Sequence, residues 1–313
     1  MVRRLIIPAI LAILAVAGCG PLAPRRDIVL RIASQKGGTR ALLEASHVLV
    51  GAPYRVEWSE FPSAQTLLEA VSDGAADVGG AGDAPFLFAY ASGARIEVLQ
   101  ALRYGADGST VAIIAPIGSS IHSTGDLKGR RIATGRGSIG HYLLLRVLES
   151  AGLTPKDVDI VYLSPGDAKA ALGSGAVDAW ASWDPYVALA VLQGEDRIVV
   201  TGKGLLHDIS FQAVNRTALT TKRAALDDLV QRMDRAYAWE AGHVHDYAAA
   251  LAKDTGLPPG VSTVMTAHLL PHPVRVDDAL IAEERDTLRH FQAAGVIARS
   301  PDVKAALEET AGK

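Results

Sequence analysis

The sequence is poor in the residues on which several classes of protein depend. Its 313 residues include one cysteine, Cys19, and aromatic residues make up only 5%. A single cysteine excludes an intrachain disulfide and a metal site built on paired cysteines. The formal net charge of −3 provides no basic field for nucleic acid, so we expect no nucleic-acid partner.

Sequence motifs for catalysis or energy coupling are also missing. No Gly-x-x-x-x-Gly-Lys-Ser/Thr loop is present, which excludes the ATPase of a transport system. Gly135–Ser138 is not the Gly-x-Ser-x-Gly turn of a hydrolase, and Ser138 with His141 lacks an evident orienting carboxylate. His243 and His245 point to opposite sides of a predicted helix. We therefore expect no catalytic residues, no metal and no cofactor.

The first residues have the pattern of an export signal. Arg3 and Arg4 precede an apolar run, Leu5–Val16, that is too short to span a bilayer unaided. Small residues then lead directly to Cys19, as in a bacterial lipoprotein cleavage site. We expect a signal peptide over residues 1–18, lipid attachment at Cys19 and a tether over 19–27. The alternative is an ordinary signal peptide with an incidental cysteine. No later apolar run approaches membrane-spanning length.

Two segments about one lobe apart share one layout. Gly74–Pro85 and Gly175–Tyr186 each run Gly-Ala-x-Asp, then small and apolar residues, then a second Asp six positions after the first. The layout predicts a helix end, a buried strand and a new helix capped by the second Asp. Ligands of open α/β sheets bind at the carboxyl ends of strands. Ordinary capped turns are the alternative interpretation.

The chain around these segments predicts an α/β fold with two lobes. A glycine-containing turn, Ser34–Thr39, follows a first strand, and Gly135–Ser138 follows a strand in the second half. We place lobe 1 over residues 28–114 and 216–313, and lobe 2 over 115–215. The chain is expected to cross near Pro116–Gly118 and to return at Phe211–Asn215. The lobe that carries the helices after residue 216 is left open.

Three segments together resemble the aliphatic sulfonate-binding proteins, which are solute receptors of ABC importers in the sulfonate, nitrate and taurine group. They are Asp73–Pro85, Lys128–Ser138 and Gly175–Tyr186. The resemblance covers nearly the whole mature chain. It implies a type II periplasmic-binding-protein fold, two lobes joined by a hinge with two crossings, and no catalysis. The implied protein is a monomer that delivers a small anion, a sulfonate, to a membrane permease coupled to a cytoplasmic ATPase.

The resemblance also implies which residues contact the ligand. Amides and hydroxyls suit a sulfonate, which stays ionised at physiological pH. Trp183 is expected to pack on the organic tail, and Asp83 and Asp184 either touch the ligand or only cap helices. The implied ligand-binding set is Gln35, Gly82, Asp83, Ala84, Gly137, Ser138, Ile139, Trp183 and Asp184.

Several points stay open at this level. Arg136 stands where relatives have small residues, so it either reaches the cleft or faces solvent, and His141 is a candidate for the cleft rim. Pro85 is followed by Phe86 where many relatives have a second proline. These departures leave nitrate, taurine or a thiamine-precursor pyrimidine as alternative ligands. A free-standing sensor and an enzyme are the alternative classes. We expect the protein to be periplasmic or at the cell surface.

Overall fold

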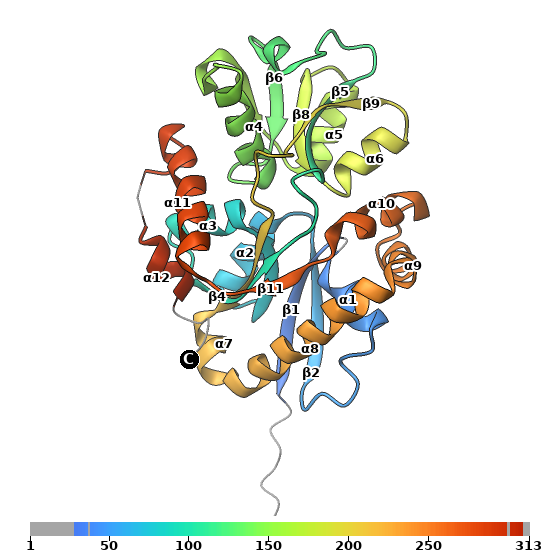
Figure 1. Cartoon of the computed structure of the whole chain (residues 1–313), viewed down its shortest axis with the longest axis vertical. Coiled ribbons are helices and arrows are strands. Elements are labelled where there is room, and N and C mark those ends of the chain that lie inside the picture. Colours follow the sequence, from blue (N-terminus) through green and yellow to red (C-terminus); the bar gives the residue numbers. More distant parts are fainter. Residues whose placement is uncertain (1–27, 37, 299–300, 309–313) are drawn as a thin grey trace, which may run out of the picture.

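Two β-sheets define the two lobes, which lie one above the other in Figure 1. The computed structural model describes residues 28–36, 38–298 and 301–308. The predicted signal peptide, Cys19 and the tether lie outside these residues. None of the described helices is long and apolar enough to cross a membrane.

The lower sheet in Figure 1 has six strands in the order β11-β4-β10-β3-β1-β2. β1 pairs in parallel with β2 and β3, whereas β10 runs antiparallel to β3 and β4, and β11 is antiparallel to β4. The strands are β1 (Val29–Gln35), β2 (Arg55–Phe61), β3 (Val78–Gly82), β4 (Ile96–Arg103), β10 (Ile209–Asn215) and β11 (His272–Val274).

The upper sheet has five strands in the order β7-β6-β8-β5-β9 and repeats this arrangement. β6 pairs in parallel with β7 and β8, and β5 lies antiparallel to β8 and β9. The predicted internal repeat is therefore present in the topology, since β3 and β8 hold equivalent places. The strands are β5 (Val111–Pro116), β6 (Arg131–Thr134), β7 (Asp159–Tyr162), β8 (Ala179–Trp183) and β9 (Asp196–Thr201).

The helices form two groups, those that precede β10 in the chain and those that follow it. The first group is α1 (Thr39–Ala45), α2 (Ala64–Ser72), α3 (Asp83–Ala91), α4 (Ile139–Ser150), α5 (Pro165–Gly173) and α6 (Tyr186–Leu192), with 3₁₀ turns η1 (Thr124–Leu127) and η2 (Pro155–Asp157). The second group is α7 (Arg216–Thr221), α8 (Arg223–Gly242), α9 (Val244–Thr255), α10 (Pro259–Leu269), α11 (Asp278–Ala293) and α12 (Val303–Glu308).

The strand pairing corrects both predicted lobe boundaries. Residues 111–114, which the sequence predicts in lobe 1, belong to β5 in the upper sheet. β10, which the sequence predicts in lobe 2, belongs to the lower sheet. Each strand after a crossing pairs in the sheet that it enters. The crossings therefore run between β4 and β5 and between β9 and β10. Hydrophobic alternation identifies such a strand but carries no information about its pairing partner.

Close packing explains the small residues of β3. A Cβ atom added to Gly79 would lie 2.7 Å from Leu67 Cδ2 and 2.9 Å from Ala33 Cβ. Leu67 and Ala33 are fully buried, so neither can yield without opening the core. The glycine at this position thus lets α2 pack directly on β3.

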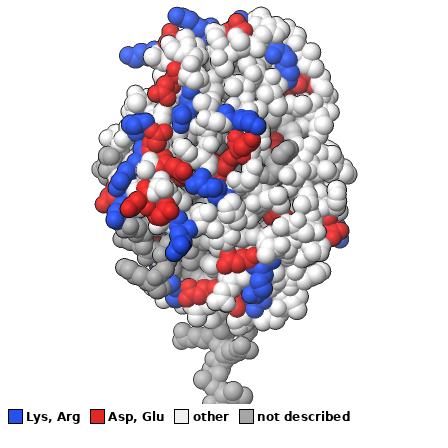
Figure 2. All heavy atoms as spheres, in the orientation of Figure 1, with Lys and Arg blue, Asp and Glu red and all other residues white. Residues whose placement is uncertain are grey.

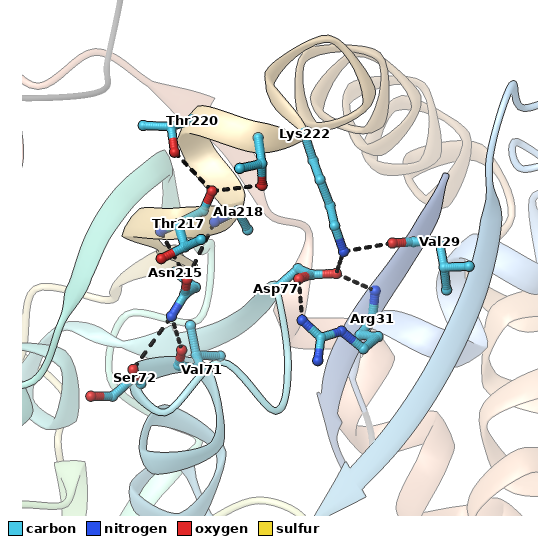
Figure 3. Close-up of polar contacts among 11 residues, drawn as sticks. Val29, Arg31, Val71, Ser72, Asp77, Asn215, Thr217, Ala218, Thr220 and Lys222 are labelled. Carbon is cyan, nitrogen blue, oxygen red and sulfur yellow. Dashed lines mark hydrogen bonds and ion pairs between the residues drawn. The ribbon is translucent and has the colours of Figure 1, made fainter. Parts of the chain in front are cut away.

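The late helices pack on the lower lobe and also reach the upper one. α8 and α9 lie against α1, and α12 lies against β4. α10 contacts α6, and α11 contacts both α3 and α4, so these two helices flank the gap between the lobes (Figure 1). At the start of this region Asn215 caps α7, because its Oδ1 accepts hydrogen bonds from Thr217 and Ala218, while its amide donates to Val71 O at 2.8 Å (Figure 3).

Candidate ligand-binding site

A cavity of about 240 Å³ lies between the two sheets and is lined by both lobes. It contains seven of the nine predicted ligand-binding residues. β1, β3 and α3 contribute from the lower lobe, and the β6–α4 turn and the end of β8 contribute from the upper lobe. The seven residues are Gln35, Gly82, Asp83, Ser138, Ile139, Trp183 and Asp184.

Gln35 ends β1 and is fixed by the neighbouring strand. Its Nε2 donates a hydrogen bond to Gly80 O at 3.0 Å, which holds the amide against the carboxyl end of β3. One N–H of that amide group is used by this bond, and the second remains for a ligand. Gly82 follows at the end of β3 and serves as the N-cap of α3. The predicted cap, Asp83, is instead the first residue of the helix.

Asp83 is a buried carboxyl group with one partnered oxygen. Its side chain is 2% exposed, and Oδ1 accepts a hydrogen bond from Ala84 N at 2.6 Å, while Oδ2 has no protein partner. Burial raises the pKa of Asp83 to about 7, and the charges of Asp208 and Glu283 add to the rise. A carboxyl group of this kind is partly protonated near neutral pH and can donate a hydrogen bond to an anion.

The start of α4 supplies donors from the upper lobe. Ser138 is the N-cap, and its Oγ accepts a hydrogen bond from His141 N at 3.0 Å. The N–H groups of Ile139 and Gly140 lie before the first intrahelical bond and have no partner within the helix. Free amides at a helix N-terminus favour an anion, and Ser138 and Ile139 both line the cavity.

Two predicted contact residues do not line the cavity. Ala84 is fully buried in the lower core. Gly137 has a φ of +70° and lies against Phe88 of α3, so closely that an added Cβ would meet the ring at 2.3 Å. Gly137 therefore packs against the opposite lobe, and this contact leaves no space for a side chain at the turn.

Trp183 and Asp184 close the cavity at the end of β8. Trp183 is half-buried and meets Tyr186 edge-on, with ring centroids 5.7 Å apart, and it also lines a second cavity of about 670 Å³ beside the first. Asp184 Oδ1 accepts a hydrogen bond from Ala188 N at 3.0 Å in the first turn of α6, and Asp184 lines the first cavity. The N-cap of α6 is Pro185 and not the predicted Asp184.

Arg136 and His141 have other places. Arg136 is exposed, its guanidinium lies 5.4 Å from the centroid of the Tyr162 ring, and it lines the second cavity. His141 is fully buried and accepts a hydrogen bond from Gly137 N on Nδ1, so it does not form a cleft rim. Burial lowers the pKa of His141 to about 4, with a smaller contribution from Arg136. The imidazole is therefore neutral at physiological pH, and its ring does not meet Ser138 Oγ as a base would.

Sequence analysis did not predict several of the residues that line the cavity. Most of them come from β10, α8 and α9. These elements lie far along the chain from the repeated segments, so no local pattern indicates that they are close to those segments in space. Among these residues Glu240 carries a signal in the sequence: it lies three residues after Tyr237 and seven after Met233, on the apolar face of α8, where a charged residue is unexpected. The missed residues include Tyr104, Asp208, Gln212, Tyr237, Glu240 and Tyr247.

The arrangement suits the binding of a small molecule between two lobes. Among the described residues there is no group of three His, Cys, Asp or Glu side chains that could hold a metal ion. Figure 2 shows basic and acidic side chains interspersed on the face presented, with no extended basic field there. The polar side chains that line the cavity carry amide, hydroxyl and carboxyl groups and one ammonium group, that of Lys36.

A search of protein families matches residues 56–243 to the family described as NMT1/THI5 like. Among curated proteins, the chain is 33% identical over 306 residues to an aliphatic sulfonates-binding protein of Escherichia coli (strain K12), with 96% of this chain and 95% of the relative covered.

Solved structures give the same result. The alkanesulfonate-binding protein SsuA from Xanthomonas axonopodis pv. citri, bound to MOPS, matches with a TM-score of 0.81 and 32% identity, covering 89% of this chain and 97% of that one. The desulfurization enzyme DSZB has a TM-score of 0.65 at 20% identity, covering 90% of this chain and 96% of that chain. The second likeness concerns the fold alone.

Proposed function

The chain belongs to the NMT1/THI5-like family and is related over nearly its whole length to sulfonate-binding proteins, and from this we propose that it is the solute receptor of an ABC importer. It binds an aliphatic sulfonate between its lobes and delivers it to a membrane permease. A cytoplasmic ATPase, a separate chain, drives the import. The receptor acts as a monomer and performs no chemistry on its ligand.

One observation carries this proposal: a single cavity is lined by predicted contact residues of both sheets. Gln35 and Asp83 come from the lower lobe, and Ser138 and Trp183 come from the upper lobe. A ligand that touches all four holds the lobes together. The two crossings, between β4 and β5 and between β9 and β10, permit a hinge motion that separates them again.

The polar groups divide the ligand into two ends. The sulfonate meets the amide of Gln35, the first amides of α4 and the protonated carboxyl of Asp83, which together replace its hydration. The apolar tail packs on Trp183. The carboxyl group of Asp83 therefore acts as a donor, which removes the conflict between an anionic ligand and an acidic residue.

Thermal unfolding with a ligand panel tests the proposal. Alkanesulfonates of increasing length are expected to raise the midpoint, since a ligand at a hundredfold excess over its Kd adds about 2.7 kcal/mol to the free energy of unfolding. The panel includes taurine, nitrate, sulfate and pyrimidines. A rise with nitrate or a pyrimidine alone would assign the receptor to another ligand, and no rise with any sulfonate would refute the proposal.

We further propose that the receptor is periplasmic or at the cell surface and is anchored by lipid on Cys19. Two observations support this: the sequence pattern before Cys19, and the relationship to the periplasmic aliphatic sulfonate-binding protein SsuA of Escherichia coli. Labelling of cells with a radioactive fatty acid should mark the wild-type protein and leave Cys19→Ala unlabelled. Label retained by the variant would contradict lipid attachment at this residue.

The alternative of an enzyme has one supporting observation, the fold shared with DSZB. Fold alone does not assign chemistry. Ser138 Oγ accepts a hydrogen bond from the backbone of His141, and the imidazole faces Gly137 N and Tyr162 instead. Chromatography of sulfonates after incubation with the protein is expected to recover them unchanged. Appearance of a product would overturn the receptor role.

A further inference from the structure

Glu240 is a buried carboxyl group that lines the cavity and has no side-chain partner within the described part of the chain. It lies in the last turn of α8, is 1% exposed and lines the cavity. Neither of its two side-chain oxygens has a hydrogen-bond partner among the described residues. A buried acid that lacks partners is costly to maintain, which makes Glu240 a candidate for contact with a ligand group.

Three tyrosines, Tyr104, Tyr237 and Tyr247, line the same cavity as this carboxyl group. Burial is the main cause that raises their pKa values, and the charge of Glu240 adds to the rise at each. The Tyr237 hydroxyl accepts a hydrogen bond from Gln212 Nε2 at 3.2 Å. Carboxylate and phenol oxygens are acceptors for the N–H groups of a cation.

The charges that line the cavity are unequal in sign. Its titratable side chains other than tyrosine are four carboxyl groups and one ammonium group, that of Lys36, which is exposed. Ionisation of these carboxyl groups would give the cavity a net negative charge, which an ammonium group of the ligand can balance and a plain alkanesulfonate cannot. The carboxyl end of α8 is the negative end of its helix dipole, whereas α4 presents its positive end to the same cavity. The four carboxyl groups are Asp83, Asp184, Asp208 and Glu240.

We propose that the cavity contains a second subsite, formed by Glu240 with Tyr104, Tyr237 and Tyr247, that binds a cationic nitrogen of the ligand. The preferred substrates are then sulfonates that carry an ammonium group at the far end of a short alkyl chain. This inference rests on the proposed function, because the sulfonate must occupy the other end of the cavity. The positive N-terminus of α4 matches the sulfonate of such a ligand, and the negative C-terminus of α8 matches its ammonium group.

Binding includes a proton transfer that can be followed. Burial raises the pKa of Glu240 to about 8, so without ligand the group is mainly protonated at pH 7. The incoming ammonium donates hydrogen bonds to the Glu240 oxygens and favours the ionised carboxylate. The carboxyl proton then passes to solvent. A plain alkanesulfonate offers no such group and leaves Glu240 protonated.

The test uses two ligands of equal size, 3-aminopropanesulfonate and butanesulfonate, which differ by an ammonium group in place of a methyl group. Isothermal titration calorimetry on the full mature chain gives both affinities for the wild type, Glu240→Gln and Glu284→Gln. Glu284 is the matched control because it is fully buried, has two unpartnered side-chain oxygens and does not line the cavity. Titrations at pH 7 in buffers of different ionisation enthalpy count the protons released.

The wild type is expected to bind 3-aminopropanesulfonate at least tenfold more tightly than butanesulfonate. Glu240→Gln should weaken the amino ligand about 10- to 100-fold, since a hydrogen bond to a charged group is lost, and should change butanesulfonate less than about threefold. Glu284→Gln should leave the ratio of the two affinities intact, because any effect through the charge of Asp83 acts on the sulfonate end that both ligands share. At pH 7 the amino ligand should release about one proton more than butanesulfonate, because proton uptake at Asp83 on meeting the sulfonate is common to both ligands.

Two different failures can be told apart. If butanesulfonate binds and 3-aminopropanesulfonate binds no better, or if Glu240→Gln weakens both equally, the cation subsite is refuted and the receptor role remains. If neither sulfonate binds, the proposed function is itself wrong, and the subsite is refuted with it. Unfolding midpoints of both variants show whether each protein is folded under the conditions of the titration.

Discussion

Arg31 and Asp77 are joined by three hydrogen bonds that tie β1 to the start of β3. Asp77 Oδ2 accepts from Arg31 N at 2.7 Å, and Asp77 Oδ1 accepts from the Arg31 guanidinium at 2.7 Å (Figure 3). The third bond runs from Asp77 N to Arg31 O at 2.7 Å. Lys222 Nζ adds a fourth bond, 2.7 Å from Asp77 Oδ2. Burial alone would raise the pKa of Asp77, but the hydrogen bonds from Arg31 and Lys222 outweigh it and lower the pKa.

Asp178 repeats this relationship in the upper lobe. Its Oδ2 accepts from Arg131 N at 2.8 Å, its Oδ1 accepts from the Arg131 guanidinium at 2.9 Å, and its own N–H donates to Arg131 O at 2.8 Å. The first Asp of each repeated segment therefore fixes the neighbouring parallel strand. The second Asp of each segment, six residues later, lines the cavity. One local pattern thus supplies a structural and a site residue in both lobes.

The two strand-fixing aspartates should differ in their effect on stability. Asp77 is 2% exposed and Asp178 is 27% exposed. Asp77→Asn breaks a buried ion pair and should lower the free energy of unfolding by about 2 to 4 kcal/mol. Asp178→Asn breaks a more solvated pair and should cost about 1 kcal/mol or less. Urea denaturation followed by circular dichroism measures both. Equal losses would show that burial does not decide the strength of these pairs.

The sequence predicts those parts of the molecule that depend on local patterns. The Gly-Ala-x-Asp segments, with Asp83 and Asp184 at helix starts, indicate the carboxyl ends of β3 and β8, and hence one wall of the cavity from each lobe. A helix start and a short apolar strand are signalled within about a dozen residues. The resemblance to a known family added the two-lobed fold, which the relationship to the Escherichia coli protein confirms.

The remaining parts depend on contacts between distant residues. β5 and β10 each join a sheet that depends on how the chain crosses between the lobes, and no alternation of residues encodes that choice. Gly137 matched the family pattern, yet its role is to contact Phe88, which no reading of the turn alone reveals. Glu240 lies more than 200 residues from Gln35 in the chain, and only its odd place in an apolar stripe hints at its function.

Trp183 is expected to set the preference for tail length. Trp183→Ala removes apolar contact at about 25 cal/mol per Å², so octanesulfonate should lose about tenfold or more in affinity, and methanesulfonate should lose little. Trp58→Ala is the control, since this half-buried tryptophan lies in the lower core and does not line the cavity. Titration calorimetry with both ligands makes the comparison. An equal loss for the short and the long ligand would show that Trp183 supports the fold instead.

Gly137 is expected to control how closely the lobes approach. In Gly137→Ala the new Cβ would meet the Phe88 ring at 2.3 Å, so the β6–α4 turn must move away from α3. The affinity for a sulfonate should fall about tenfold, because the new contact opposes the closed form in which residues of both lobes touch the ligand. Small-angle X-ray scattering with ligand should show a larger radius of gyration than for the wild type.

Gly175→Ala separates this effect from backbone strain. Gly175 has a φ of +73°, close to that of Gly137, but no atom lies within 4 Å of its added Cβ. Both variants should lose about 1 kcal/mol of stability from the left-handed backbone. Only Gly137→Ala should lose affinity. If the two variants bind equally well, the contact between Gly137 and Phe88 does not govern binding.

Glu240 should make the protein less stable as the pH rises without ligand. Its pKa is about 8 in the folded chain, against an ordinary value of 4.5, and burial is the cause. Between these two values the unfolded chain has lost the proton that the folded chain retains. The stabilisation is therefore complete below pH 4.5 and is lost as the pH rises to about 8. Asp83 acts in the same direction, from 3.8 to about 7.

Glu240→Gln should remove its own part of this dependence. The glutamine at this position cannot ionise. Between pH 4.5 and pH 8 the free energy of unfolding should therefore decrease less in the variant than in the wild type, and the difference should reach up to a few kcal/mol. Urea denaturation at intervals of one pH unit gives both curves, and Glu69→Gln, at an exposed site, is the control that should follow the wild type. A residue that is exposed in both the folded and the unfolded chain contributes no such difference. Parallel curves for Glu240→Gln and the wild type would therefore mean that Glu240 is solvated in the folded chain. The argument that Glu240 is a buried partner of the ligand would then fail.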